Sequence, residues 1–267
     1  MILWVDGAHD AAENMRRDER LLARATEGAE PVLRLFAFAP PGITLGRGQS
    51  PERELDLERC AADGIAWALR PTGGRAIFHA DDWSYSLSAA LDHRDWGGAA
   101  SRAYARASAL IVASLNRLGV PAAFAPGVAR AAEGARGPGR GTEPCFTSTA
   151  RHEVVLHGRK LVGSAQRRTA RALLQQGSVL LGGAHVGLAD YLALPEPRRR
   201  EVREQLRMRT AHAGDYLGPA PPLATWGDAL MAELPPCSSH RDAMEGLFLL
   251  TLSKNDSYTR DPSPAEA

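Results

Sequence analysis

Residues 153–181, EVVLHGRKLVGSAQRRTARALLQQGSVLL, decide the fold. Short apolar runs separated by polar and turn-forming residues predict three strands in this segment. Gly158 follows His157 between the first two runs, and glycine readily adopts the positive φ of a hairpin turn. The segment therefore predicts a hairpin followed by another strand, with the three strands over 153–156, 159–166 and 173–181.

Outward from this segment, the chain predicts further strands and then a mostly helical end. We expect strands over 2–6, 31–39, 43–47, 67–70, 76–79 and 83–91, and helices over 8–25, 53–63, 99–118 and much of 186–254. Hairpin-like spacing predominates over repeated βαβ units, so the pattern indicates an α+β fold, a sheet covered by helices. We expect one domain over 1–254, with a mobile loop over 127–143 and a disordered tail over 255–267.

Composition excludes several classes of function. The 267 residues carry a formal net charge of +1, without the basic excess of a nucleic-acid-binding protein. No apolar run is long enough to span a membrane, and no signal peptide is recognisable at the N-terminus. The three cysteines form neither a disulfide framework nor a CxxC zinc motif, which favours a reducing, cytoplasmic compartment.

Lys160 is one of only two lysines among 32 Lys and Arg residues. Lysine can lose its proton when neighbours or burial favour this, whereas arginine cannot, so a lysine kept here indicates a need for that property. The alternative is an ordinary surface charge. In the same strand, the three small residues Gly163, Ser164 and Ala165 indicate that another group lies against the backbone.

Cys145 directly follows the Gly- and Arg-rich loop, where a thiolate could be both stabilised and reached. It is a candidate nucleophile, although a small buried cysteine is the alternative. Cys60 and Cys237 lie in expected helical segments and read as structural.

Paired glycines occupy the segment 70–79, RPTGGRAIFH. Such a turn lets a backbone approach a ligand closely and can present amides to an anion or carbonyl oxygen. It matches neither a Walker A loop nor GxGxxG. A tight turn with a buried histidine is the alternative reading.

These segments together resemble the lipoate–protein ligase and octanoyltransferase family. The similarity covers 70–79, 158–167 and 173–181, with weaker similarity in Asn14-Met15, Asp18-Glu19 and 45–49, so about residues 1–195 in all. This resemblance implies a central mixed, largely antiparallel sheet flanked by helices, as in the catalytic domain of biotin protein ligases. It also implies substrate-binding roles for Arg70, Thr72, Gly73, Gly74, Arg75, His79, Gly163, Ser164, Ala165 and Gln166.

Two features are similar to the octanoyltransferase branch. The turn reads Thr-Gly-Gly-Arg at 72–75, whereas the ATP-dependent ligases usually have three glycines, and Cys145-Phe146 stands 15 residues before Lys160. There are also departures, because Gln176 stands where the family usually has His, and 147–152 lacks its common Pro-Ser and aromatic pattern. These departures put the acyl pocket and the acceptor surface in doubt more than the Cys/Lys pair.

The resemblance implies acyl transfer in protein lipoylation, from octanoyl-acyl carrier protein through a Cys145 thioester to a lysine of a lipoyl-type or glycine-cleavage H-type acceptor. Lys160 would lower the pKa of Cys145 and exchange a proton between the two steps. No cofactor or metal is expected. One alternative is an ATP-dependent lipoate–protein ligase, which would use ATP and Mg²⁺. Another is a non-catalytic binding or regulatory protein on the same fold. For His79, a structural role and a catalytic role are both open.

Overall fold

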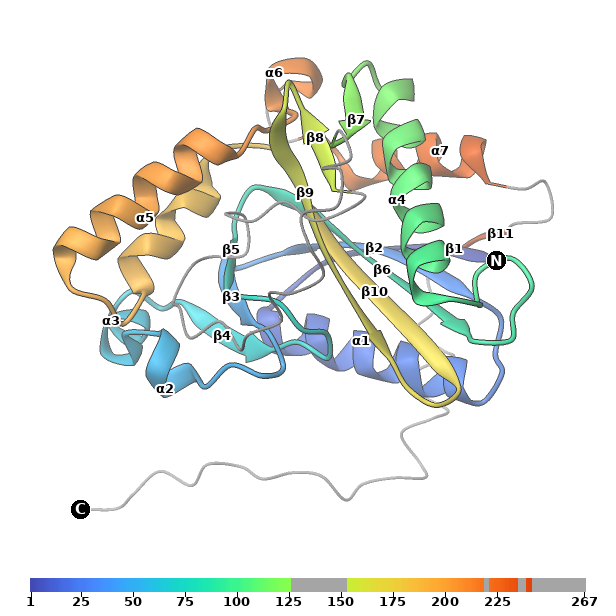
Figure 1. Cartoon of the computed structure of the whole chain (residues 1–267), viewed down its shortest axis with the longest axis horizontal. Helices are drawn as coiled ribbons and strands as arrows, with labels where there is room; N and C mark the ends of the chain where they lie inside the picture. Colours follow the sequence, from blue (N-terminus) through green and yellow to red (C-terminus); the bar gives the residue numbers. More distant parts are fainter. Residues whose placement is uncertain (126–152, 219–220, 235–238, 242–267) are drawn as a thin grey trace, which may run out of the picture.

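The computed structural model describes residues 1–125, 153–218, 221–234 and 239–241, the last of these as backbone only. Cys145 and Cys237, the expected loop 127–143 and the expected tail 255–267 lie outside these ranges. The described residues form an eight-stranded sheet, a three-stranded sheet and surrounding helices (Figure 1).

The large sheet is mixed and largely antiparallel, as expected. Its order is β11-β1-β2-β6-β10-β9-β8-β7, and only the β11-β1 and β1-β2 pairs are parallel. The strands are β1 (Ile2–His9), β2 (Val32–Phe38), β6 (Asp82–Ala90), β7 (Ala122–Phe124), β8 (Val154–Leu156), β9 (Arg159–Arg168), β10 (Ala172–Leu180) and β11 (Ser239–Arg241). The predicted β8–β9 hairpin is confirmed, with His157 and Gly158 at φ of 49° and 75°.

Helix α1 (Ala11–Thr26) joins β1 to the parallel strand β2, so the strand, helix and strand expected over 2–39 form a βαβ unit. The Asp10 side chain caps α1 by accepting a hydrogen bond of 2.8 Å from the Glu13 amide. The inward face carries polar groups as well as apolar ones: Asn14 and Asp18 are fully buried beside Met15.

The small sheet has the order β4-β3-β5, with β3 (Gly42–Leu45), β4 (Ala66–Leu69) and β5 (Ile77–His79). A single helix was expected over 53–63, but the structure has two, α2 (Pro51–Glu54) and α3 (Leu57–Ala62). The chain is extended at Leu55, which forms a β-bridge to Leu192, and Asp56 then caps α3. A tertiary contact therefore breaks the helix that local periodicity predicted.

Helices cover both faces of the large sheet (Figure 1). Helix α1 lies on one face, and α4 (Ala100–Arg117) with α7 (Leu223–Glu233) lies on the other. The main core is on the α4 side, where the rings of Trp83 and Trp226 stack with centroids 5.3 Å apart. On the inner face of α4, Ala103, Ala107, Leu110, Ile111 and Ser114 are buried, and Leu118, just after the helix, is partly buried.

After β10 the chain is mostly helical, with a 3₁₀ segment η2 (Ala184–Tyr191), α5 (Glu196–Arg209), α6 (Gly214–Leu217) and α7. Residues 239–241 depart from this mostly helical pattern and form β11 against the edge of β1. Strand edges carry unpaired backbone groups, and β11 satisfies those of Ile2–Trp4. Within the described ranges, no helix has the length and apolar character needed to cross a bilayer.

Candidate functional site

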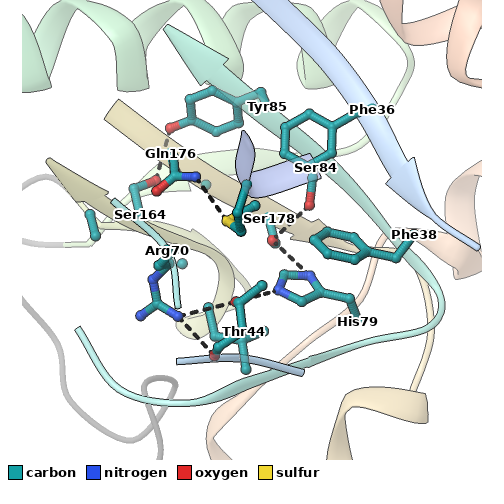
Figure 2. A pocket seen from close by; sticks show the side chains of 15 residues that line it. Phe36, Phe38, Thr44, Arg70, His79, Ser84, Tyr85, Ser164, Gln176 and Ser178 are labelled. Atoms are coloured by element: carbon teal, nitrogen blue, oxygen red, sulfur yellow. Dashed lines mark hydrogen bonds between the residues drawn. The ribbon is translucent and has the colours of Figure 1, made fainter. Parts of the chain in front are cut away.

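A narrow pocket opens between the two sheets, at the place where five of the ten expected substrate-binding residues meet (Figure 2). It holds about 380 Å³ of unfilled space, including its open mouth. One wall is apolar and the other is a strip of strand backbone with small side chains. Its lining residues are Met15, Phe36, Phe38, Thr44, Arg70, Ile77, His79, Ser84, Tyr85, Gly163, Ser164, Ala165, Gln176, Gly177 and Ser178.

Arg70 holds the turn 70–75 together. Its buried guanidinium donates hydrogen bonds to the carbonyl oxygens of Gly73, Arg75 and Thr44, at 3.0, 2.7 and 3.0 Å. Five donors in a rigid fork suit this clustering of carbonyls. Although Arg70 lines the pocket, these bonds direct much of its hydrogen-bonding capacity to the protein's own backbone.

Gly46 supports the same turn from β3. A Cβ at this position would lie 2.0 Å from the carbonyl oxygen of Gly74, so only glycine lets the two segments approach this closely. Gly73 and Gly74 are exposed at the tip of the turn, and neither they nor Arg75 are among the residues that line the pocket.

His79 is held on both ring nitrogens. Nδ1 lies 2.9 Å from Oδ2 of Asp82. Nε2 lies 2.8 Å from Oγ1 of Thr44, and Phe38 stacks on the ring with centroids 3.9 Å apart (Figure 2). Burial alone would raise the pKa of Asp82, but the charge of His79 and hydrogen bonds from His79, Ser84 and Ser178 outweigh it and lower the pKa. Both nitrogens of His79 therefore have partners within the protein, and the ring forms part of the pocket wall.

Gln176 joins the pocket to a buried ionic cluster. Its Oε1 accepts a hydrogen bond of 2.6 Å from Thr72, and its Nε2 donates one of 2.6 Å to Asp18. Asp18 in turn pairs with Arg34 at 2.8 Å, and both side chains are fully buried. The departure from the usual histidine therefore leaves a satisfied polar network. Sequence reasoning missed Arg34, although a lone arginine in the apolar run 32–38 was a signal for it.

A hydroxyl pair closes the far side of the pocket. The Tyr85 hydroxyl lies 2.9 Å from Oγ of Ser164, and burial raises the pKa of Tyr85. Tyr85 packs directly over Gly177, where a Cβ would lie 2.4 Å from the ring. Gln166 points elsewhere, toward Gln175 at 3.3 Å, and does not line the pocket.

Lys160 lies outside the pocket, near the start of β9 and before the pocket residues Gly163–Ala165. Its side chain is 6% exposed, and Nζ lies 2.5 Å from Oε1 of Glu153. The interpretation as a surface charge is therefore wrong. Glu153, which sequence reasoning missed, directly follows the segment that contains Cys145. Because Cys145 is outside the described residues, the Cys145–Lys160 pair stays a prediction.

Comparison with known proteins agrees with this fold. The model of the lipoyl protein ligase A/B catalytic domain family matches residues 10–235. A curated octanoyltransferase, LipM of Moorella thermoacetica, is 37% identical over 77% of this chain and 73% of its own length. LipM of Kyrpidia tusciae is 35% identical over 75% and 72%.

A solved structure shares the fold. The bi-partite lipoate protein ligase of Thermoplasma acidophilum, described with its E2 lipoyl domain, has a TM-score of 0.65 at 21% identity and covers 94% of this chain and 91% of its own. The fold is therefore that of an α+β catalytic domain of the lipoate-ligase class. The chain belongs to the lipoyl protein ligase A/B catalytic domain family. The match extends past residue 195, where the sequence resemblance was expected to end, and includes α5 and α7.

Proposed function

We propose that the chain is an octanoyltransferase of protein lipoylation. The observation that carries this proposal is its 32–37% identity, over most of its length, to curated octanoyltransferases. The pocket agrees with it, because Met15, Phe36, Phe38 and Ile77 offer apolar contacts to a thin acyl chain. We expect the whole of 1–254 to act as one domain, in the cytoplasm.

The reaction proceeds in two acyl transfers. The Cys145 thiolate attacks the thioester carbon of an octanoyl-acyl carrier protein, and the carrier thiol leaves with a proton from Lys160. The ε-amine of a lysine on a lipoyl-type or H-type acceptor then attacks the Cys145 thioester, an amide forms, and Lys160 takes up the proton that the amine loses. Lysine suits this exchange because it can be either donor or acceptor, which arginine cannot.

The described residues support both steps. Glu153 fixes the ammonium of Lys160 at the end of the segment that carries Cys145. Gly163, Ser164 and Ala165 bring strand backbone to the pocket, where an amide could stabilise the oxyanion, an effect worth about 3 kcal/mol in the barrier. An acceptor of the lipoyl-domain type is supported by the Thermoplasma ligase, which is described with its E2 lipoyl domain.

Intact mass spectrometry tests the proposal directly. After mixing with octanoyl-acyl carrier protein, the chain should gain one octanoyl group, and Cys145→Ser should gain none. Cys60→Ala is the matched control, at a buried cysteine in α3, and should keep the adduct. Absence of an adduct on the wild-type chain, or ATP–pyrophosphate exchange with octanoate that survives Cys145→Ser, would favour an ATP-dependent ligase instead.

A further inference from the structure

A second cavity lies at the turn of the β8–β9 hairpin, between this turn, the end of α5 and α6. It holds about 750 Å³ of unfilled space, including its open mouth, and its lining includes His157, Arg159, Arg207, Thr210, Asp215 and Tyr216. It shares no residue with the pocket between the two sheets, which we call the acyl pocket. We propose that this hairpin cavity binds the phosphate of the phosphopantetheine arm that presents the octanoyl group, an inference that rests on the proposed function.

The charge of the hairpin cavity favours an anion. Arg159 and Arg207 are both exposed, and in the described part of the chain neither has a carboxylate partner. The one carboxylate in the lining, that of Asp215, is 78% exposed, so water screens it strongly. Burial lowers the pKa of His185, at the back of the cavity, to about 4, so this side chain is neutral at pH 7.

The shape and chemistry favour phosphate over a protein carboxylate. Two guanidinium groups from different elements, β9 and α5, face one concave space, and each can donate two parallel hydrogen bonds to phosphate oxygens. His157 Nε2 and the Tyr216 hydroxyl form a hydrogen bond of 2.6 Å with each other, and this pair still has one N–H or O–H to donate to a ligand. A concave site of this size admits a small group and excludes the flat face of a protein.

Strand β9 runs from the hairpin cavity to the acyl pocket. Arg159 begins this strand, and Ser164 lines the acyl pocket five residues later. At about 3.4 Å per residue, the two positions are roughly 17 Å apart. An extended phosphopantetheine arm can span this length, so a phosphate in the hairpin cavity would place the thioester beside Gly163–Ala165.

The test compares two small donors, octanoyl-pantetheine and octanoyl-4′-phosphopantetheine, which differ only in the phosphate. We expect kcat/KM for the phosphorylated donor to be about tenfold higher or more, as for loss of a charge-assisted hydrogen bond. Arg159→Gln and Arg207→Gln should each reduce this preference while kcat/KM for octanoyl-pantetheine stays unchanged. Arg200→Gln, at an exposed arginine of α5 outside the cavity, is the control and should keep the preference.

Calorimetric binding of 4′-phosphopantetheine separates this inference from the proposed function. If transfer fails with both donors but binding is weakened by Arg159→Gln and Arg207→Gln, the proposed function fails and the phosphate site stands. Equal use of the two donors, or a preference that neither variant changes, overturns the site. Binding of inorganic phosphate as tight as that of 4′-phosphopantetheine would also overturn it, because the pantetheine arm would then play no part.

Discussion

Lys160 is buried, and its ammonium is held by a single described carboxylate, that of Glu153. A buried pair of this kind costs desolvation energy and is weak evidence for a purely stabilising role. What it provides is a fixed position for a group that can exchange a proton. A lysine on a strand edge could otherwise reach solvent and sample many rotamers.

Lys160→Arg tests the need for proton exchange at this position. Arginine keeps the positive charge opposite Glu153, but it cannot give up its proton. We expect octanoyl transfer to fall by about a hundredfold or more, the usual contribution of a general acid–base group. Thermal unfolding should confirm that the variant is folded. Near-full activity in a folded variant would show that Lys160 exchanges no proton.

Gln176 can donate to Asp18 and accept from Thr72 at the same time because an amide has both functions. In Gln176→Glu, a carboxylate would face that of Asp18, so the pKa of the new side chain should be raised in the folded state. A group whose pKa is raised in the folded state adds stability at low pH, and this added stability is lost as pH rises. Relative to wild type, we expect the free energy of unfolding to increase from pH 7 to pH 5.

Urea unfolding at both pH values measures this effect. Gln205→Glu, on the surface helix α5, should show little pH dependence beyond that of the wild type, since water screens an exposed pair. A Gln176→Glu variant that is equally stable at both pH values would mean that Asp18 and Gln176 do not interact in solution.

Sequence analysis identified several residues that line the site, but it did not identify the partners that contact them. Arg70, His79 and Gly163–Ala165 meet in one pocket, because each lies in a motif of local sequence. The partners Glu153, Asp18 and Arg34 come from separate elements that only tertiary folding brings together. Arg34 has a signal in the sequence, because it is the one charged residue of the apolar run 32–38, and this shows that a partner is needed but cannot identify it.

At the scale of elements, β3 and the turn 70–75 depend on one close approach. Gly46→Ala would place a Cβ against the Gly74 carbonyl, a backbone atom that cannot rotate away. We expect the free energy of unfolding to fall by about 1–3 kcal/mol, the usual cost of overpacking, and octanoyl transfer to fall with it because the turn shifts. Chemical denaturation and the mass-spectrometric assay measure the two effects.

Gly48→Ala is the matched control, two residues along the chain. No atom lies within 4 Å of a Cβ at Gly48, so this variant should resemble the wild type in stability and activity. If Gly46→Ala were as stable as Gly48→Ala, the turn would have to be loose enough to move without cost.

The elements themselves were predictable where the signal is local. Alternation predicted the strands β2 and β6, a short apolar run predicted β10, and helical periodicity predicted α1 and α4. The failures have tertiary causes. Leu55 bridges to Leu192 and divides a predicted helix, and 239–241 become a strand only because β1 offers an open edge. Neither partner can be recognised from a window of neighbouring residues.

At the scale of the whole molecule, His185 makes stability depend on pH. Its folded pKa of about 4 lies below the ordinary value of 6.5, so the fold favours the neutral ring. This stability is complete above pH 6.5 and is lost as pH falls toward 4. The difference between these two pKa values corresponds to about 3 kcal/mol in the free energy of unfolding. We expect urea unfolding to show this loss, and His185→Gln to show a smaller one.

His157→Gln, at an exposed histidine, is the control for that experiment and should keep the pH dependence of the wild type. Equal pH dependence in His185→Gln and the wild type would mean that another group is responsible.

The pairing of β11 with β1 has a consequence for the order in which the molecule can be completed. Ile2–Trp4 is made first, and its partner 239–241 is made near the end of synthesis. On the ribosome, this apolar edge stays open while more than two hundred residues are added, and an open edge is where strands of different chains join. The nascent chain therefore has a long interval in which this open edge is accessible to a chaperone or to a strand of another chain.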